Sequence, residues 1–428
     1  MQNTAASTNY SPSQSISKQE RVFGFRDHAS LWFSLGVGLL VMQMGAYLIP
    51  ALGTRSALFA IIIGSVLGSA LLAWVAQLGC NYGLSSAELM QATYGRSFAK
   101  LPVILNIIQL LGWTAFELVV MRDGFTAIIT QTTGFNATWL PFAITAVFGA
   151  LLFALASSPM IKLVRRIVVK FGLPLVIFSL LWLSVQFTLR VIHSEGGFSA
   201  FWHKTGTGEM SILAAIDLVI AMPVSWLPLV ADYSRYGKLD GQKSAFKGTW
   251  TGYVIANIWC YGLGVLIIST TTPDVDLVSA ILLAQFGLIA LGLILIDEMD
   301  NAYGDVHSGA VSLNYLLNKT SIITWGKYIT VAAAVAAMIL DMHGLEPFLL
   351  MLSSIFVPLY GVIIARLSFK STLDEGVNDN ASPVHIPSAT IWLVGIAVFH
   401  LCAHYAPQFG SAIPSLVVSL GLGWLVRK

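Results

Sequence analysis

Residues 295–305 read LIDEMDNAYGD, and they place Asp297, Glu298, Asp300 and Asp305 inside an otherwise apolar run. Each acid in the middle of a membrane helix costs roughly 2.5–3.5 kcal/mol on insertion scales. The cost matters here because 56% of the 428 residues are hydrophobic and only 10% are charged. The stretch therefore predicts a polar site inside a membrane protein.

The rest of the chain has the composition of an all-α polytopic membrane protein. A soluble domain is about one quarter charged, and a β-barrel would show short alternating segments instead of long apolar runs. Nearly uncharged runs of 18 or more residues recur, and each can span a bilayer of about 30 Å. We predict twelve transmembrane helices, at residues 29–52, 56–80, 102–129, 139–158, 164–189, 211–231, 249–271, 285–313, 321–340, 345–367, 386–404 and 411–426.

The distribution of basic residues predicts the orientation. Cytoplasmic loops carry an excess of Lys and Arg. With the N-terminus in the cytoplasm, 19 of the 23 basic residues fall on the inner side, and the remaining four are Arg55, Arg122, Arg190 and Lys204. This asymmetry predicts a multi-pass protein of the plasma (cell inner) membrane with both termini in the cytoplasm.

The polar segments predict the domain organisation. Residues 1–20 are polar and lack the apolar stretch of a signal peptide, so we expect a disordered cytoplasmic tail. Residues 21–370 hold spans one to ten, 371–385 form a cytoplasmic linker, and 386–428 hold the last two spans. The three cysteines are far apart and form no metal or redox motif. We expect no cofactor, no nucleic acid and no obligatory protein partner; the partners are the lipid bilayer and a small molecule.

The third span contains WTAFE, which places Trp113 and Glu117 four residues apart on one helical face. A flat heterocycle can stack on the indole while the carboxylate accepts a hydrogen bond from a ring or exocyclic N–H. Simple packing is the alternative for Trp113, and a bond to a neighbouring helix is the alternative for Glu117. Arg122 and Asp123, near the outer end, are expected to pair locally.

In the eighth span, Asp297, Asp300 and Asn301 fall at i, i+3 and i+4 and are predicted to share a face, with Glu298 turned about 100° away. Acids at that depth face a wet cavity or the bundle interior. Their oxygens suit a sodium ion, and buried carboxyl groups can also hold a proton. The alternative is a purely structural polar seam.

Two spans carry helix-breaking residues at corresponding places. Residues 34–53 read SLGVGLLVMQMGAYLIPALG, and 221–236 read AMPVSWLPLVADYSRY with Pro223 and Pro228. Paired interrupted helices mark the central site of many transporters. Gln43 follows the first break and is a candidate polar contact, and a bond to a neighbouring helix explains it equally well.

Residues 22–428 resemble the nucleobase–cation symporter-1 family of cytosine, allantoin and hydantoin permeases. The matching features are LIPALG (48–53), the Trp-x-x-x-acid face, WLPLVADYSRY (226–236) and DNAYG (300–304). The chain is most similar to the hydroxymethylpyrimidine transporters of that family. The resemblance implies a five-plus-five inverted repeat, as in the leucine transporter, with two helices appended.

The resemblance also implies site residues. The stacking tryptophan of the family falls on Trp113 and its hydrogen-bonding partner on Glu117. A first-span glutamine falls on Gln43, which implies sodium-ligating carbonyls at Leu39 and Met42.

Two departures affect the implied site. The sixth-span aromatic falls near Pro223, so Trp226 either replaces it or only packs. The Ser/Thr sodium ligands fall around Asp297 and Glu298, which leaves sodium and proton both open. We expect Asp297 nearest the cation, and Asp300 or Asn301 nearest the substrate.

The predicted function is import of a pyrimidine, hydroxymethylpyrimidine first, by sodium or proton symport. A cytosine or purine permease of the same family is the alternative. An intramembrane acid–base enzyme would bring its acids from two facing helices, and a channel would show charge rings or a filter sequence. The chain also lacks a G-x-x-x-x-G-K-[ST] nucleotide-binding loop.

Overall fold

The computed structural model describes residues 16–17, 19–160, 172–240, 243–272, 275–339, 345–368 and 382–426. The predicted tail (1–20) and linker (371–385) therefore lie almost wholly outside the described residues. The helices are α1 (Phe25–Ser34), α2 (Leu39–Leu52), α3 (Thr54–Tyr82), α4 (Ser86–Tyr94), α5 (Lys100–Thr133), α6 (Leu140–Ala156), α8 (Leu173–His193), α9 (Gly197–Trp202), α10 (Ile212–Ser225), α11 (Leu227–Ser234), α12 (Ser244–Ser269), α13 (Leu277–Leu282), α14 (Gly287–Leu317), α15 (Ile322–Ile339), α16 (Leu345–Leu367), α17 (Ile386–Tyr405), the 3-10 helix η2 (Pro407–Phe409) and α18 (Ala412–Leu425).

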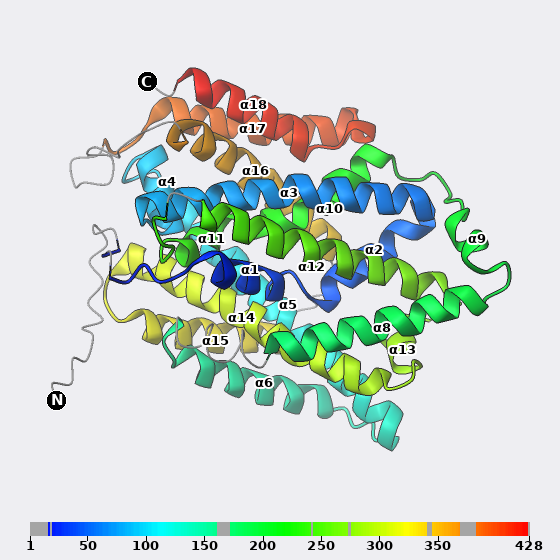
Figure 1. The fold of residues 1–428 in the computed structure, drawn as a ribbon. Coiled ribbons are helices and arrows are strands. Elements are labelled where there is room, and N and C mark those ends of the chain that lie inside the picture. The colour runs from blue at the N-terminus through cyan, green and yellow to red at the C-terminus, as the bar shows by residue number, and fades with distance from the viewer. Residues whose placement is uncertain are drawn as a thin grey trace.

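The long helices run roughly alongside one another in a single bundle (Figure 1). Within the described residues, eight helices are long and apolar enough to cross a membrane, or nine if the bent pair α1 and α2 counts as one span. Two shorter apolar helices, α6 and α18, and the acid-bearing α14 occupy three further predicted spans. The protein is therefore a multi-pass membrane protein, and the count of twelve spans and the inverted repeat stay predictions.

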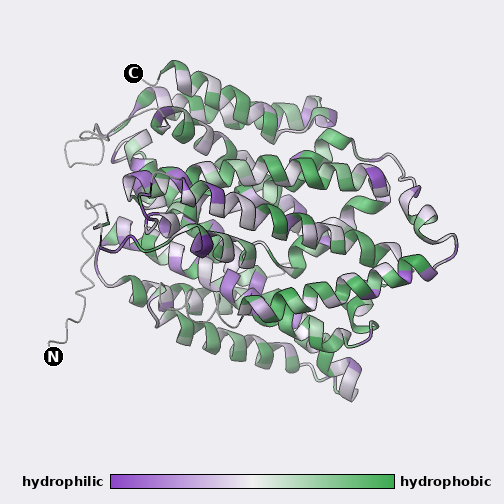
Figure 2. Cartoon of the chain, viewed as in Figure 1, coloured by the Kyte–Doolittle hydropathy of each residue, from purple (hydrophilic) through white to green (hydrophobic). Residues whose placement is uncertain are grey.

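Hydrophobic residues cover most of the helical surface (Figure 2). Hydrophilic residues gather at the end of the bundle where the N-terminal segment lies, and others lie midway along α14 (Figure 2). A polar stretch inside a long buried helix is the arrangement that a membrane protein uses for a functional site.

The first span breaks where its glycines predict. Helix α1 ends at Ser34, α2 begins at Leu39, and the two are bent by 61°. A Cβ atom on Gly36 would lie 2.8 Å from Ala256 Cβ on α12, so glycine permits close approach at the break. Small residues at such contacts let membrane helices pack backbone to backbone.

The sixth span is interrupted as predicted, but less sharply than the first. Helices α10 and α11 are separated only at Trp226, and Ile212–Ser234 continues as one apolar span. The Trp226 N–H donates to the Pro223 carbonyl, 3.3 Å away, and Pro228 occupies the first turn of α11, where its missing N–H is not needed. The proline pair therefore interrupts the helix without turning it sharply.

Candidate functional site

A small cavity lies where the α1–α2 break meets α5, α10, α12 and α14. Its volume is about 20 Å³, room for roughly one water molecule. The lining residues are Leu35, Gly38, Leu40, Val41, Trp113, Glu117, Met222, Ser225, Trp226, Tyr253, Glu298, Asn301 and Asp305. Five helices and two helix breaks contribute to this wall, so the cavity depends on how the whole bundle packs.

Side chains of α14 bind the backbone groups that the α1–α2 break leaves free. The Leu39 N–H donates to Glu298 Oε1 at 2.5 Å. Asn301 Nδ2 donates to the Val37 carbonyl at 3.1 Å and to Glu298 Oε2 at 3.0 Å. A carboxylate at the first turn of α2 also interacts favourably with the helix dipole. Glu298 and Asn301 therefore hold the break against α14.

Helix α5 supplies Trp113 and Glu117, which line the cavity together. The Trp113 ring packs edge-on against Phe348, with centroids 5.1 Å apart, and lies 6.0 Å from the Phe116 ring. Glu117 approaches Glu298 across the cavity, and its Oε2 has no hydrogen-bond partner among the described residues. A packed indole and an unsatisfied carboxyl oxygen together form a wall that a planar hydrogen-bonding ring can use.

The opposite wall carries Trp226 and Tyr253. Trp226 is 9% exposed and packs edge-on against Trp32, with centroids 6.0 Å apart. Tyr253 comes from α12, and its hydroxyl lies beside Trp226 without a well-formed hydrogen bond in the described part of the chain. Trp226 therefore both lines the cavity and packs, and its contact with a substrate stays a prediction.

The cavity is acidic. Of the thirteen described residues that line it, Glu117, Glu298 and Asp305 carry carboxyl groups and none is Lys, Arg or His. Carboxylates accept hydrogen bonds and attract positive charge. The arrangement can therefore bind a flat molecule that presents N–H donors.

The face predicted for α14 is divided in the structure. Asn301 lines the cavity with Glu298, whereas Asp297 and Asp300 line a separate hollow between α6, α8 and α14. The prediction that Glu298 turns away from the site is wrong, and Asp300 does not reach the cavity. Polar residues occupy several faces of this part of α14. The i, i+3, i+4 spacing of Asp297, Asp300 and Asn301 therefore did not decide which face of the helix lines the cavity.

Asp297 and Asp300 lie beside Ser34 at the end of α1. Ser34 Oγ, Asp297 Oδ2 and both Asp300 carboxyl oxygens lack a well-formed hydrogen bond among the described residues. Buried polar atoms are nearly always satisfied, so this group of weakly bonded oxygens is a candidate position for a ligand.

The sodium site implied at the carbonyls of Leu39 and Met42 and at Asp297 stays a prediction. The N–H of Leu39 is bound by Glu298, and the Met42 carbonyl lies against α12 at Gly264. Within the described residues no group of three or more His, Cys, Asp or Glu side chains could hold a metal ion. Gln43 is partly buried on α2 and does not line the cavity.

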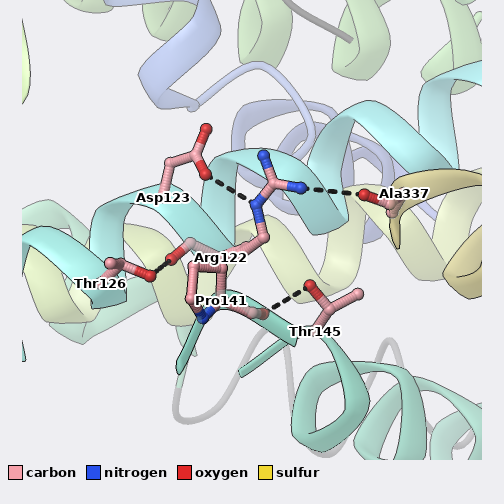
Figure 3. A network of polar contacts seen from close by, with 6 residues as sticks. All are labelled: Arg122, Asp123, Thr126, Pro141, Thr145 and Ala337. Carbon is pink, nitrogen blue, oxygen red and sulfur yellow. Dashed lines mark hydrogen bonds and ion pairs between the residues drawn. The ribbon is translucent and has the colours of Figure 1, made fainter. Parts of the chain in front are cut away.

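The predicted pairing of Arg122 and Asp123 is confirmed (Figure 3). Arg122 Nε lies 2.7 Å from Asp123 Oδ1, and Nη1 donates to the Ala337 carbonyl at 2.9 Å. The pair ties α5 to the end of α15, away from the cavity.

The sequence analysis named Glu298 and Asp305 among the acids but did not place them on the cavity wall, and it missed Tyr253 and the position of Ser34 beside the acids. The i, i+3 spacing of Glu298 and Asn301 was the available signal, because it places both on one face. Nothing in the sequence distinguished Tyr253 from the other aromatic residues of the same span.

Residues 15–379 match the family described as permease for cytosine/purines, uracil, thiamine, allantoin. The chain belongs to this family. The predicted nucleobase–cation symporter-1 membership is confirmed. The family is one of transporters and not of enzymes.

Two curated permeases share sequence with the chain. YxlA of Bacillus subtilis, named as a purine-cytosine permease, is 25% identical over 71% of this chain and 65% of its own length. The purine-cytosine permease fcyB of Emericella nidulans is 23% identical over 56% of this chain and 46% of its own. The chain thus spans less than two thirds of either permease.

Solved structures show the fold. Mhp1, a nucleobase-cation-symport-1 family transporter in a closed conformation with bromovinylhydantoin bound, superposes with a TM-score of 0.78 at 16% identity over 97% of this chain and 94% of that one. A Na+-coupled sialic acid symporter gives 0.65 at 11% identity, over 96% and 90% of the two chains. The chain therefore shares the fold of these two structures.

Proposed function

We propose that the protein imports a pyrimidine across the plasma membrane by symport with a cation, sodium or proton. One observation carries the proposal: the cavity at the α1–α2 break joins two tryptophans, Trp113 and Trp226, to the carboxyl groups of Glu117 and Glu298. Family membership supports a nucleobase-like substrate.

The chemistry of the cavity favours an aminopyrimidine. Such a ring has a flat π-face for the indoles and N–H donors for the carboxyl groups. Hydroxymethylpyrimidine fits this description and follows from the sequence resemblance. Cytosine fits it too, and the names of the two curated relatives favour a cytosine or purine substrate.

Substrate binding requires the cavity to expand. A volume of about 20 Å³ is too small for a pyrimidine ring, so residues on both sides of the break must move apart. The contacts of Glu298 and Asn301 with Leu39 and Val37 are the ones that movement at the break would change. Such movement is what alternating access requires of a discontinuous helix.

The coupling cation is assigned to the cluster of Ser34, Asp297 and Asp300. Its oxygens lack well-formed hydrogen bonds and are hard donors that suit sodium, and the carboxyl groups can equally carry a proton. Because the cluster lies at the end of α1 and on α14, cation binding would act on the same break that the substrate cavity uses. An inward gradient of the coupling cation would then drive import.

Uptake into proteoliposomes tests the function. We expect radiolabelled hydroxymethylpyrimidine or cytosine to accumulate only when an inward sodium or proton gradient is imposed, and gradients applied separately identify the ion. Uptake that needs ATP and ignores both gradients would exclude symport. Tenfold excesses of unlabelled hydroxymethylpyrimidine, cytosine, adenine and uracil then rank the substrates.

A further inference from the structure

A second hollow lies at the end of the bundle that holds the N-terminal segment. It is formed where α6 and α11 end, beside α14 and the start of α15, and its volume is about 230 Å³. The backbone bridge between Phe23 and Gly237 marks the same end. On the predicted topology this end faces the cytoplasm.

The wall of this hollow is aromatic and polar. Tyr303 and His307, one turn apart on α14, lie with their rings nearly parallel at 18° and 6.2 Å between centroids. Tyr236 lines the hollow from the end of α11. His307 Nε2 is buried and makes no hydrogen bond within the described residues. The Tyr303 hydroxyl donates to the Ser158 carbonyl at 3.3 Å.

Another hollow, with an almost wholly apolar wall, serves for comparison. It lies between α6 and α15, measures about 330 Å³, and is lined by Ala, Gly, Val, Met, Phe153 and Thr330. Thr330 already donates to the Gly326 carbonyl at 2.9 Å, so that hollow offers a ligand no free polar side chain. The hollow at Tyr236, Tyr303 and His307 is different because it offers ring faces and an unsatisfied imidazole nitrogen.

Helix α14 connects the two sites. Asp305 lines the first cavity, whereas Tyr303 and His307 line the second hollow. Tyr233 lies between them, since its hydroxyl donates to the Gly304 carbonyl at 3.1 Å and its ring lies 5.5 Å from the His307 ring. Tyr233 therefore stands between the first cavity and the second hollow on this side of α14.

We propose that the hollow is a second binding site for the transported heterocycle, occupied after it leaves the first cavity. The ligand is a planar nitrogen heterocycle that stacks on the tyrosine rings and hydrogen-bonds to His307 Nε2. The inference rests on the proposed function, because it takes the same molecule as the ligand of both sites.

Binding stoichiometry tests the inference. Equilibrium dialysis of the purified full-length protein with radiolabelled cytosine and hydroxymethylpyrimidine, up to millimolar concentration, counts the molecules bound per chain. We expect two for the parent and one for His307→Phe, which keeps an aromatic ring but removes the nitrogen, with the tighter dissociation constant unchanged within twofold. His193→Phe, at the exposed end of α8, is the matched control and keeps two.

The outcomes separate the two claims. One molecule bound by the parent, or two by His307→Phe, would overturn the second site and leave the proposed function standing. No saturable binding of either pyrimidine would overturn both. Transport adds a second readout: His307→Phe lowers the maximal uptake rate several-fold while the concentration for half-maximal uptake stays within twofold. An unchanged maximal rate would contradict a site on the exit route.

Discussion

Buried carboxyl groups occur in two very different settings in this molecule. Asp217 on α10 accepts backbone hydrogen bonds from Ser411, Ala412 and Ile413 at 2.8–3.1 Å, at the start of α18. Around α14, by contrast, Asp297 and Asp300 lie beside Ser34, and three of their oxygens lack a well-formed hydrogen bond in the described part of the chain. Both settings put acids inside the membrane, but only the first uses every oxygen.

The difference separates a structural acid from a functional one. At the start of a helix, backbone N–H groups and the helix dipole compensate a carboxylate fully, and Asp217 thereby fixes the last helix to the core. An uncompensated acid is costly in a membrane and persists where a ligand completes it. Glu298 combines both roles, because it caps α2 through Leu39 and still lines the cavity.

The largest expected effect is on Asp297. Asp297→Asn keeps the shape but removes the charge, so cation-driven accumulation should fall to background while substrate exchange survives. Uptake and exchange in proteoliposomes measure both. Accumulation with an unchanged ion dependence would show that Asp297 is structural, and the contrast drawn between Asp297 and Asp217 would then be wrong.

The next effect is on Asp217. Asp217→Ala leaves several buried N–H groups of α18 without an acceptor, at roughly 1–3 kcal/mol each, so we expect stability to fall by about 3 kcal/mol with transport per folded molecule retained. Thermal unfolding in detergent measures it. A variant that keeps its stability but loses transport would show that Asp217 is functional and not structural.

A smaller effect is expected at Gly38, whose added Cβ would lie 3.2 Å from both Glu298 oxygens. Its backbone is extended, so alanine is tolerated there and only the contact with Glu298 is strained. Gly38→Ala should weaken substrate binding by about tenfold, or about 1.4 kcal/mol. Gly262→Ala on α12 is the control, because its Cβ would meet nothing within 4 Å. Equal affinities for the two variants would show that the position of Glu298 is unimportant.

The smallest effect is expected at the Arg122–Asp123 pair, where the Asp123 side chain is 44% exposed. Asp123→Asn should change stability by less than about 1 kcal/mol, since exposed pairs contribute little. Thermal unfolding of Asp123→Asn and of Asp217→Ala, measured side by side, compares the two losses of stability. A loss as large as that of Asp217→Ala would mean that exposure does not distinguish these acids.

The sequence predicted the helices better than it predicted which way they face. Apolar runs and glycines located α1 and α2 and their break at residues 35–38, because both features depend only on local chemistry. The rotation of α14 depends on packing against α5 and α1, and its polar residues occupy several faces. Periodicity therefore placed Trp113 and Glu117 on the cavity wall but put Asp300 in the place of Glu298.

Equilibrium binding to the purified protein tests most directly whether the acidic, tryptophan-lined cavity binds the substrate. Hydroxymethylpyrimidine and cytosine are compared on the parent, on Glu117→Gln and on Trp113→Ala. Loss of a hydrogen bond to a charged group is worth about 1.5–3 kcal/mol, so Glu117→Gln should weaken binding by roughly ten- to a hundredfold. Trp113→Ala should weaken the binding of every ring compound tested, because each one stacks on the indole. If neither variant changes the affinity for any pyrimidine, the substrate site lies elsewhere.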